Sequence, residues 1–155
     1  MVSRVHFLPK LRETGKVANK MIRMIVGLKG TGKTKQLIEL ANKAVETSPG
    51  HVICIEKGNK LIFDVRHQVR LVDTDEYSIE GGEALYGMIC GILAANYDIK
   101  DCFIDSSLKI CKNNLDDFIV FIKKLEKLVN RYEVNCVTTV SIDMADLPAE
   151  LLEYI

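Results

Sequence analysis

The sequence predicts an α/β protein of three layers, with helices on both faces of a mainly parallel central sheet. Short apolar runs of strand length alternate along the chain with longer segments whose apolar residues recur at helical spacing. Strands that are separated by helices pair in parallel, and the helices then cover the faces of the sheet. A glycine-rich turn joins the first strand to the first helix, and 155 residues are enough for one domain with a single core.

The first strand and the first helix enclose a loop with a known motif. Residues 21–26 are apolar apart from Arg23 and predict a buried strand. The apolar residues after position 36 share one helix face: Leu37, Ile38, Leu40, Ala41, Ala44 and Val45. The intervening Gly27-Leu28-Lys29-Gly30-Thr31-Gly32-Lys33-Thr34 matches G-x-x-x-x-G-K-[ST], the phosphate-binding loop. Because this motif works between a strand and a helix, we expect the loop to bind a nucleotide.

Each residue type in this loop suits a phosphate group. The three glycines let backbone amides approach phosphate oxygens without a Cβ in the way. Amides at the start of the next helix point toward the anion, and the helix dipole favours negative charge there. We expect Lys33 to bring its ammonium group to the β- and γ-phosphates as a catalytic residue. Thr34 is expected to bind Mg²⁺, and Lys35 to bind the nucleotide together with the loop.

Further strands are predicted by short apolar runs along the rest of the chain. Most of these runs are rich in β-branched residues or end at turn residues. They are residues 51–55, two pieces within residues 60–72 (Leu61-Ile62-Phe63 and Val69-Arg70-Leu71-Val72), residues 102–104, and residues 134–140.

Three more segments predict helices, beginning at Ser78 and ending near Asn96, beginning at Asn114, and following Pro148. Gly87 and Gly91 stand four residues apart in the first of them. We expect them to give this helix a smooth face for close packing against the sheet or another helix. The helix after Asn114 carries its apolar residues on one face: Leu115, Phe118, Ile119, Ile122, Leu125 and Val129.

The residues at the strand ends are the candidates for chemistry, because ligands of such sheets bind beyond the carboxyl ends of the strands. Asp105 follows residues 102–104 and is the favoured second residue to hold Mg²⁺, through a water, with Asp73 as the competing candidate. Glu56 follows residues 51–55 and is predicted to orient or deprotonate the attacking water. Ser141, and with less support Thr139, would sense the γ-phosphate.

Composition excludes several classes of function. The net charge is zero and no dense run of Lys and Arg occurs, so an extended nucleic-acid footprint is not expected. The longest uncharged stretch, residues 84–97, is too short to span a bilayer. The five cysteines lack metal-ligand spacing and fit a reducing cytoplasm.

Residues 1–20 contain five Lys or Arg against one acid. They are interpreted as a basic, flexible extension, a partner-binding arm, or translation assigned upstream of a true start at Met21, before a nucleotide-binding domain of residues 21–155.

On the loop and the strand pattern, residues 21–148 resemble the P-loop NTPases. Gly30-Thr31-Gly32-Lys33-Thr34 is similar to the loop of the AAA and RecA-like branch, and small bacterial ATP-binding proteins of this kind also look similar. The resemblance implies that the strand of residues 134–140 inserts between the loop strand and the Asp105 strand. Glu56 corresponds to the glutamate that RecA-like enzymes keep at the end of their second strand. AAA proteins place a glutamate after the Walker B aspartate, whereas Asp105 is followed by Ser106.

The predicted function is therefore Mg²⁺-dependent ATP binding with slow ATP hydrolysis, completed by an arginine from a protein partner. The alternative is a nucleotide-dependent switch or adaptor with little turnover, followed by a small-molecule phosphotransferase. ATP is favoured over GTP because the guanine-reading sequence Asn-Lys-x-Asp is missing.

Overall fold

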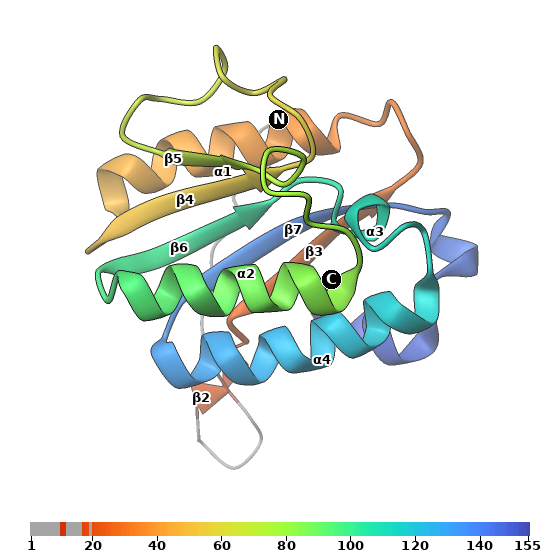
Figure 1. Ribbon diagram of the computed structural model, residues 1–155. Helices are drawn as coiled ribbons and strands as arrows, with labels where there is room; N and C mark the ends of the chain where they lie inside the picture. The colour runs from red at the N-terminus through yellow and green to blue at the C-terminus, as the bar shows by residue number, and fades with distance from the viewer. Residues whose placement is uncertain (1–9, 12–16, 19) are drawn as a thin grey trace.

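The computed structural model describes residues 10–11, 17–18 and 20–155, and most of the predicted N-terminal extension lies outside these residues. Five parallel strands form one sheet in the order β3-β7-β6-β4-β5 (Figure 1). Their bounds are β3 Ile22–Gly27, β4 His51–Glu56, β5 Arg70–Asp73, β6 Ile99–Ile104 and β7 Asn135–Ser141. Two short antiparallel strands, β1 (Lys10–Leu11) and β2 (Val17–Ala18), pair with each other. The predicted parallel sheet is confirmed.

Helices cover both faces of the sheet. In Figure 1, α1 (Lys33–Thr47) lies on one face, and α2 (Gly82–Ala95) and α4 (Leu115–Tyr132) lie side by side on the other. The short helix α3 (Ser107–Ile110) follows β6, and the chain ends in two 3₁₀ helices, Met144–Asp146 and Ala149–Tyr154. Among the described residues, no helix combines the length and apolar character that a membrane span requires.

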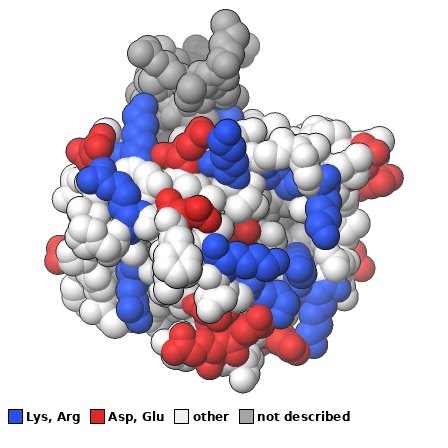
Figure 2. Space-filling model, turned by 90° about the horizontal axis from the view of Figure 1, so that it is seen from above, with Lys and Arg blue, Asp and Glu red and all other residues white. Residues whose placement is uncertain are grey.

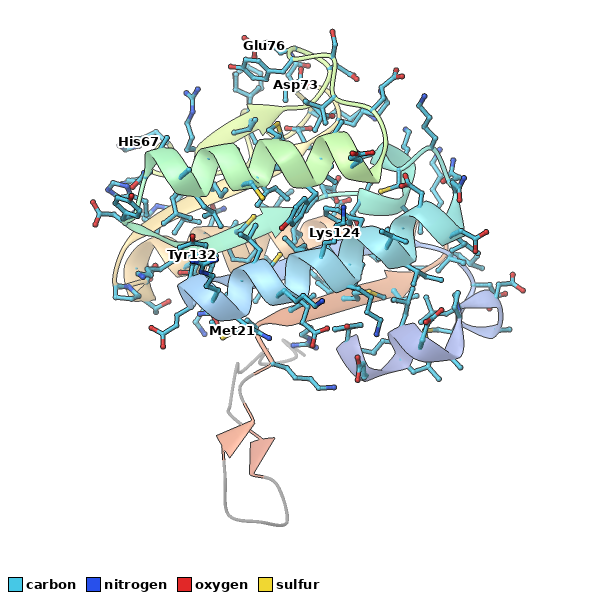
Figure 3. The ribbon with its side chains drawn as sticks, turned by 60° about the horizontal axis from the view of Figure 1, so that its bottom comes forward. Met21, His67, Asp73, Glu76, Lys124 and Tyr132 are labelled. Atoms are coloured by element: carbon cyan, nitrogen blue, oxygen red, sulfur yellow. The ribbon has the colours of Figure 1, made fainter. Side chains whose placement is uncertain are left out.

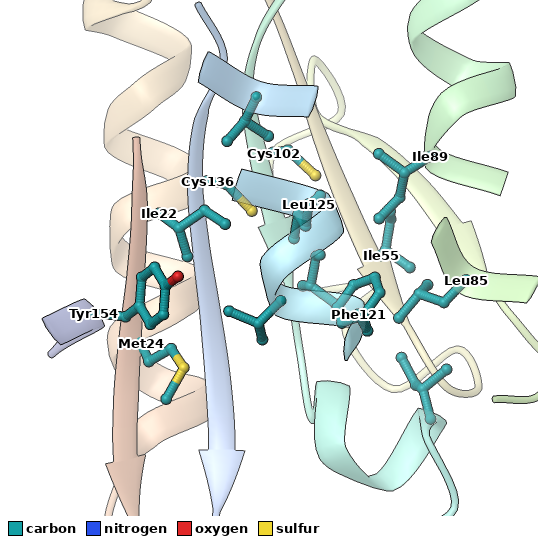
Figure 4. Close-up of a cluster of buried hydrophobic side chains, with 14 of the residues drawn as sticks. Ile22, Met24, Ile55, Leu85, Ile89, Cys102, Phe121, Leu125, Cys136 and Tyr154 are labelled. Carbon is teal, nitrogen blue, oxygen red and sulfur yellow. The ribbon is translucent and has the colours of Figure 1, made fainter. Parts of the chain in front are cut away.

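Alternation along the strands builds a separate core on each face. In β4, Cys54 packs in the cluster beneath α1, whereas its neighbour Ile55 packs in the cluster beneath α2 and α4. Figure 4 shows the second cluster, to which each covering helix and the sheet contribute: Leu85 and Ile89 from α2, Phe121 and Leu125 from α4, and Cys102 and Cys136 from the sheet. All of these side chains are buried, so the two cores hold the strands in a fixed register.

The register brings the carboxyl ends of all five strands to one edge. Gly27 pairs with Ser141, Ile55 pairs with Ile104, and Glu56 pairs with Asp73. The residues that leave these strands therefore gather at the edge where the loop between β3 and α1 begins, as expected for a parallel sheet.

One predicted strand and one predicted helix start are wrong. Leu61-Ile62-Phe63 forms a turn rather than a strand, and the Phe63 side chain is 95% exposed. The segment has the apolar composition of a strand, but its Leu61 amide donates a hydrogen bond to the Glu56 carboxylate at the end of β4. Ser78 does not cap a helix: it lies in a turn with φ of 54°, and α2 begins at Gly82 with Gly81 as its N-cap. The predicted start at Asn114 is confirmed, because its side chain accepts a hydrogen bond from the Asp117 amide.

The expected close packing of Gly87 and Gly91 is also wrong. Both glycines are exposed on the outer side of α2, and a Cβ added at either position would meet no atom within 4 Å. The helix instead buries Leu85, Ile89 and Leu93. The spacing of two glycines alone does not show which side of the helix they occupy. In α2 the large apolar residues occupy the buried side.

Candidate functional site

The loop between β3 and α1 has a shape that its glycines make possible. Gly30 and Gly32 both have φ of +83°, in the left-handed region that residues with a Cβ rarely adopt. A Cβ at Gly27 would lie 2.8 Å from the Thr31 hydroxyl oxygen. Thr31 in turn donates a hydrogen bond of 2.7 Å to the Leu28 carbonyl. The backbone angles therefore favour glycine at positions 30 and 32, and the Thr31 side chain leaves no room for a Cβ at position 27.

Lys33 is the first residue of α1, and its side chain folds back onto this loop. Its Nζ donates to the Leu28 carbonyl at 2.7 Å and lies 3.5 Å from the Thr31 hydroxyl. Burial lowers the pKa of Lys33, and the nearby Asp105 carboxylate acts in the opposite direction. The ammonium group is thus held where the loop turns, with one loop carbonyl as its main acceptor.

Asp105 leaves the end of β6 and meets residues from two other elements. The Thr34 hydroxyl donates to Asp105 Oδ1 at 3.0 Å, although the two residues stand 71 positions apart. The Thr139 hydroxyl of β7 donates to the same oxygen at 2.7 Å and accepts from the Ser106 amide at 2.7 Å. The Ser106 hydroxyl lies 3.5 Å from Oδ2. Three hydroxyl groups, which we call the hydroxyl cluster (Thr34, Ser106 and Thr139), therefore surround this carboxylate.

The oxygens of Thr34 and Asp105 fit magnesium. Mg²⁺ prefers oxygen ligands and is usually held by one or two carboxylates together with waters and substrate phosphates. A hydroxyl and a carboxylate already within hydrogen-bond distance match this donor set. Among the described residues, no three His, Cys, Asp or Glu side chains gather closely enough to hold a metal by themselves. A metal at this site would thus share its coordination with a ligand.

A cavity of about 600 Å³ lies against this loop, within the usual size of ligand pockets, about 300–1,000 Å³. Its lining comes from the loop, the start of α1, the turn after β4, the segment after β6 and the end of β7. The polar residues of the lining include Lys29, Lys33, Thr34, Lys35, Lys60, Asp105, Ser106, Lys109, Asn113 and Ser141.

Glu56, the predicted water-activating residue, is held by backbone amides. Its Oε1 accepts from the Lys60 amide at 3.0 Å and its Oε2 from the Leu61 amide at 3.1 Å. The residue is 2% exposed and is not among those that line the cavity. Burial raises the pKa of Glu56, and the two amide hydrogen bonds oppose that rise. The carboxylate therefore anchors the turn that follows β4.

Asp73, the competing metal candidate, has a similar set of partners. Its Oδ1 accepts from the Gly58 amide at 2.7 Å and from the Asp75 amide at 2.8 Å. It ends the edge strand β5, and Figure 3 shows it near Glu76, far from Lys124 and Tyr132 on α4. Of the two aspartates, Asp105 is the one that contacts Thr34.

The two hydroxyl residues at the end of β7 divide between the cavity and the hydroxyl cluster. Ser141 is exposed and lines the cavity, as a residue that meets a ligand must. Thr139 is buried and bonded to Asp105, a contact that sequence reasoning missed. Residues two apart in a strand face the same way, so Thr139 shares the side of β7 on which Ser141 lies, and its contact with Asp105 depends on the position of β6.

Lys60 and Lys109 were also missed as lining residues. Each stands four positions after a strand-end carboxylate, Glu56 or Asp105, in the loops where ligand-binding residues are most common.

No protein-family model matches the chain, and a search of the curated proteins finds no relative. The residues and contacts of the chain itself therefore have to carry its functional assignment.

Proposed function

We propose that this protein is a P-loop NTPase that binds ATP with Mg²⁺ and hydrolyses it slowly. The observation that carries the proposal is the 3.0 Å contact between the Thr34 hydroxyl and the Asp105 carboxylate. The loop motif predicts a metal-binding role for Thr34, and the position after a core strand predicts one for Asp105. These two reasons are independent of each other. Their meeting at one edge supports a shared metal site.

The order of the strands gives further support. In the AAA and RecA-like branch, a strand inserts between the loop strand and the strand that ends in the metal-binding aspartate. Here β7 lies between β3 and β6 and pairs with both in parallel. This order places Thr139 and Ser141 of β7 between the loop and Asp105.

In this proposal, the amides of residues 27–34 and the side chain of Lys35 hold the phosphates, and Lys33 adds its ammonium group to the β- and γ-phosphates. Thr34 and Asp105 would hold Mg²⁺, which when bound neutralises charge on the phosphate oxygens. Ser141, exposed at the end of β7, is positioned to contact the γ-phosphate.

One observation favours the second candidate function, a nucleotide-dependent switch with little turnover. A general base must reach the proton of the attacking water. Both Glu56 oxygens instead accept backbone amides beneath the cavity lining. This arrangement suits an anchor better than a base, and a protein without a free base would hydrolyse ATP slowly.

Binding of ATP and GTP to the full chain, with and without Mg²⁺, tests the proposal by calorimetry. Thr34→Ala should weaken the Mg²⁺-dependent binding, whereas the matched Thr47→Ala, at the exposed end of the same helix, should leave it unchanged. Absence of saturable nucleotide binding to the unmodified chain would rule the proposal out.

Steady-state phosphate release then separates enzyme from switch. If Glu56 is the base, Glu56→Gln lowers turnover by about 10²–10⁴-fold in protein that remains folded. Turnover that is insensitive to this change identifies another base, with Glu76 and Glu80 as the next residues to test. No turnover above background supports the switch.

A further inference from the structure

The cavity against the loop is more positively charged than one nucleotide requires. Among the described residues, one carboxylate (Asp105) and five lysines line the cavity, so the lining carries four net positive charges. The lysines are Lys29, Lys33, Lys35, Lys60 and Lys109. A nucleoside triphosphate with one bound Mg²⁺ carries roughly two net negative charges. About two positive charges therefore remain without a counter-charge once the nucleotide is bound.

The lysines of the cavity differ from their neighbours just outside it. Lys57 forms an ion pair with Asp75 at 2.6 Å, and Lys112 forms one with Glu80 at 3.2 Å. Within residues 20–155, neither Lys60 nor Lys109 has a carboxylate partner within 4.0 Å. The acids of this region thus neutralise the outer lysines and leave the cavity positive.

Lys60 is held at the cavity by a buried carboxylate. Glu56 accepts the Lys60 and Leu61 amides, and the Leu61 side chain is buried in the core beneath α1. Both oxygens of this buried side chain accept backbone amides of the turn, so the turn is fixed at the end of β4. The turn therefore places Lys60 at the cavity.

Lys109 is held by a different set of buried polar groups. It lies on α3, where Ser107 donates from its hydroxyl to the Thr139 carbonyl at 3.4 Å and accepts from the Thr138 hydroxyl at 2.6 Å. Ser107 and Thr138 are fully buried. This short helix is therefore fixed to β7, and it carries Lys109 at the cavity.

We propose that Lys60 and Lys109 form a second anion subsite beside the phosphate-binding loop, which takes a small ligand that carries a phosphate monoester. A phosphate monoester carries close to two negative charges at neutral pH, about the charge that remains to be balanced. The inference rests on the proposed nucleotide site, since Lys33 and the loop take the nucleotide's own phosphates.

A small ligand fits better than a nucleic acid. The subsite lies in a cavity of about 600 Å³ rather than on an extended surface. Figure 2 shows basic and acidic side chains interspersed over the face seen from above, with acidic ones gathered near its lower edge. A compact phosphate ester fits within a cavity, whereas a nucleic-acid backbone needs an extended basic surface, and the face in Figure 2 does not offer one.

Calorimetry on the full chain tests the subsite in two steps. The protein is first saturated with Mg²⁺ and adenylyl imidodiphosphate, which fills the loop. Inorganic phosphate, ribose 5-phosphate and unphosphorylated ribose are then titrated separately. Saturable binding of ribose 5-phosphate but not ribose is expected. Inorganic phosphate shows whether the free ion is sufficient or the ester is preferred.

The double variant Lys60→Gln/Lys109→Gln should weaken binding of ribose 5-phosphate at least about tenfold, because two charged contacts are lost. It should change the affinity for adenylyl imidodiphosphate by less than about threefold. Lys127→Gln, on the exposed side of α4, is the control and should change neither.

Three results would overturn the subsite. These are no saturable binding of either phosphate probe to the loaded protein, an equal loss of affinity for the nucleotide analogue in the double variant, and tighter binding of a short single-stranded oligonucleotide at the same lysines. Failure of the proposed function itself appears earlier, as absence of analogue binding to the unmodified chain.

Discussion

Two carboxylates at neighbouring strand ends hold different kinds of partners. Asp105 follows β6 and is surrounded by the hydroxyl cluster, whereas Glu56 ends β4 and is bonded to two backbone amides. A hydroxyl group can rotate away when a metal or water replaces it, and the rest of the chain need not move. A backbone amide can leave its acceptor only if the turn that contains it changes shape. The partner, rather than the carboxylate, therefore separates a ligand-binding position from an anchoring one.

The largest expected effect tests the anchoring side of this comparison. Glu56→Ala leaves the Leu61 amide without its acceptor in a buried position and the Lys60 amide without one in a partly buried position. At about 1–3 kcal/mol for the buried amide and less for the partly buried one, the free energy of unfolding should fall by about 2–4 kcal/mol. Urea denaturation followed by circular dichroism measures the change.

Asp105→Ala is the matched variant for the other side. Its hydroxyl partners can rotate toward other acceptors or water, so the free energy of unfolding should fall by about 1 kcal/mol or less. Equal losses for the two variants would remove the distinction between anchor and ligand.

The sequence was sufficient for the elements whose local pattern and tertiary role agree. The loop of residues 27–34, the strand before it, the helix after it and the Asn114 cap are each defined by neighbours in the chain. It was insufficient where a distant group decides. Leu61-Ile62-Phe63 has the composition of a strand, but the Glu56 side chain takes the Leu61 amide and bends the segment into a turn.

The candidate site follows the same rule. Asp105 could be predicted because parallel strands end at one edge, and the register then brings it to Thr34. The sequence favoured Ser141 over Thr139 as the residue near the γ-phosphate. The contact of Thr139 with Asp105 could not be predicted, since both residues face the same way from β7 and only the position of β6 puts one of them against Asp105. Likewise, no local signal distinguishes a carboxylate with amide partners from one with hydroxyl partners.

The second prediction concerns the ligand side. If the loop binds a nucleotide as proposed, Lys33→Ala removes the ammonium group from the β- and γ-phosphates, and ATP affinity should fall by about 1.5–3 kcal/mol. Calorimetry on protein with an unchanged circular dichroism spectrum measures this loss. Lys43→Ala, farther along α1 and exposed, is the control. Unchanged ATP affinity in the Lys33 variant would contradict a phosphate-binding role for the loop.

The third prediction compares the two aspartates. Asp105→Asn should reduce the Mg²⁺-dependent part of the ATP binding free energy by about 1 kcal/mol, because a neutral amide is a weaker magnesium ligand. Binding without metal should stay nearly the same. Asp73→Asn should have little effect, since Asp73 is engaged with the Gly58 and Asp75 amides. The reverse pattern in a magnesium titration would transfer the metal site to Asp73.

The smallest expected effect is a pH dependence specific to the anchor. Burial raises the pKa of Glu56 above its ordinary value of 4.5, so between these two values the folded protein binds a proton that the unfolded chain has released. The stabilisation from this group is therefore fully present below pH 4.5 and is lost as the pH rises through the raised pKa. Burial also raises the pKa of Asp101, so the pH profile of the unmodified chain alone would combine the two groups.

The difference between the unmodified chain and Glu56→Gln isolates the anchor. Glutamine has one carbonyl oxygen for two amides and cannot ionise, so the unmodified chain should be the more stable of the two, by the largest margin at acidic pH. That margin should shrink steadily as the pH increases from 4.5. Urea denaturation of both proteins at a series of pH values measures it. A margin that is constant or grows with pH would mean that Glu56 is not held as a buried carboxyl, and its contrast with Asp105 would then have to be sought in geometry alone.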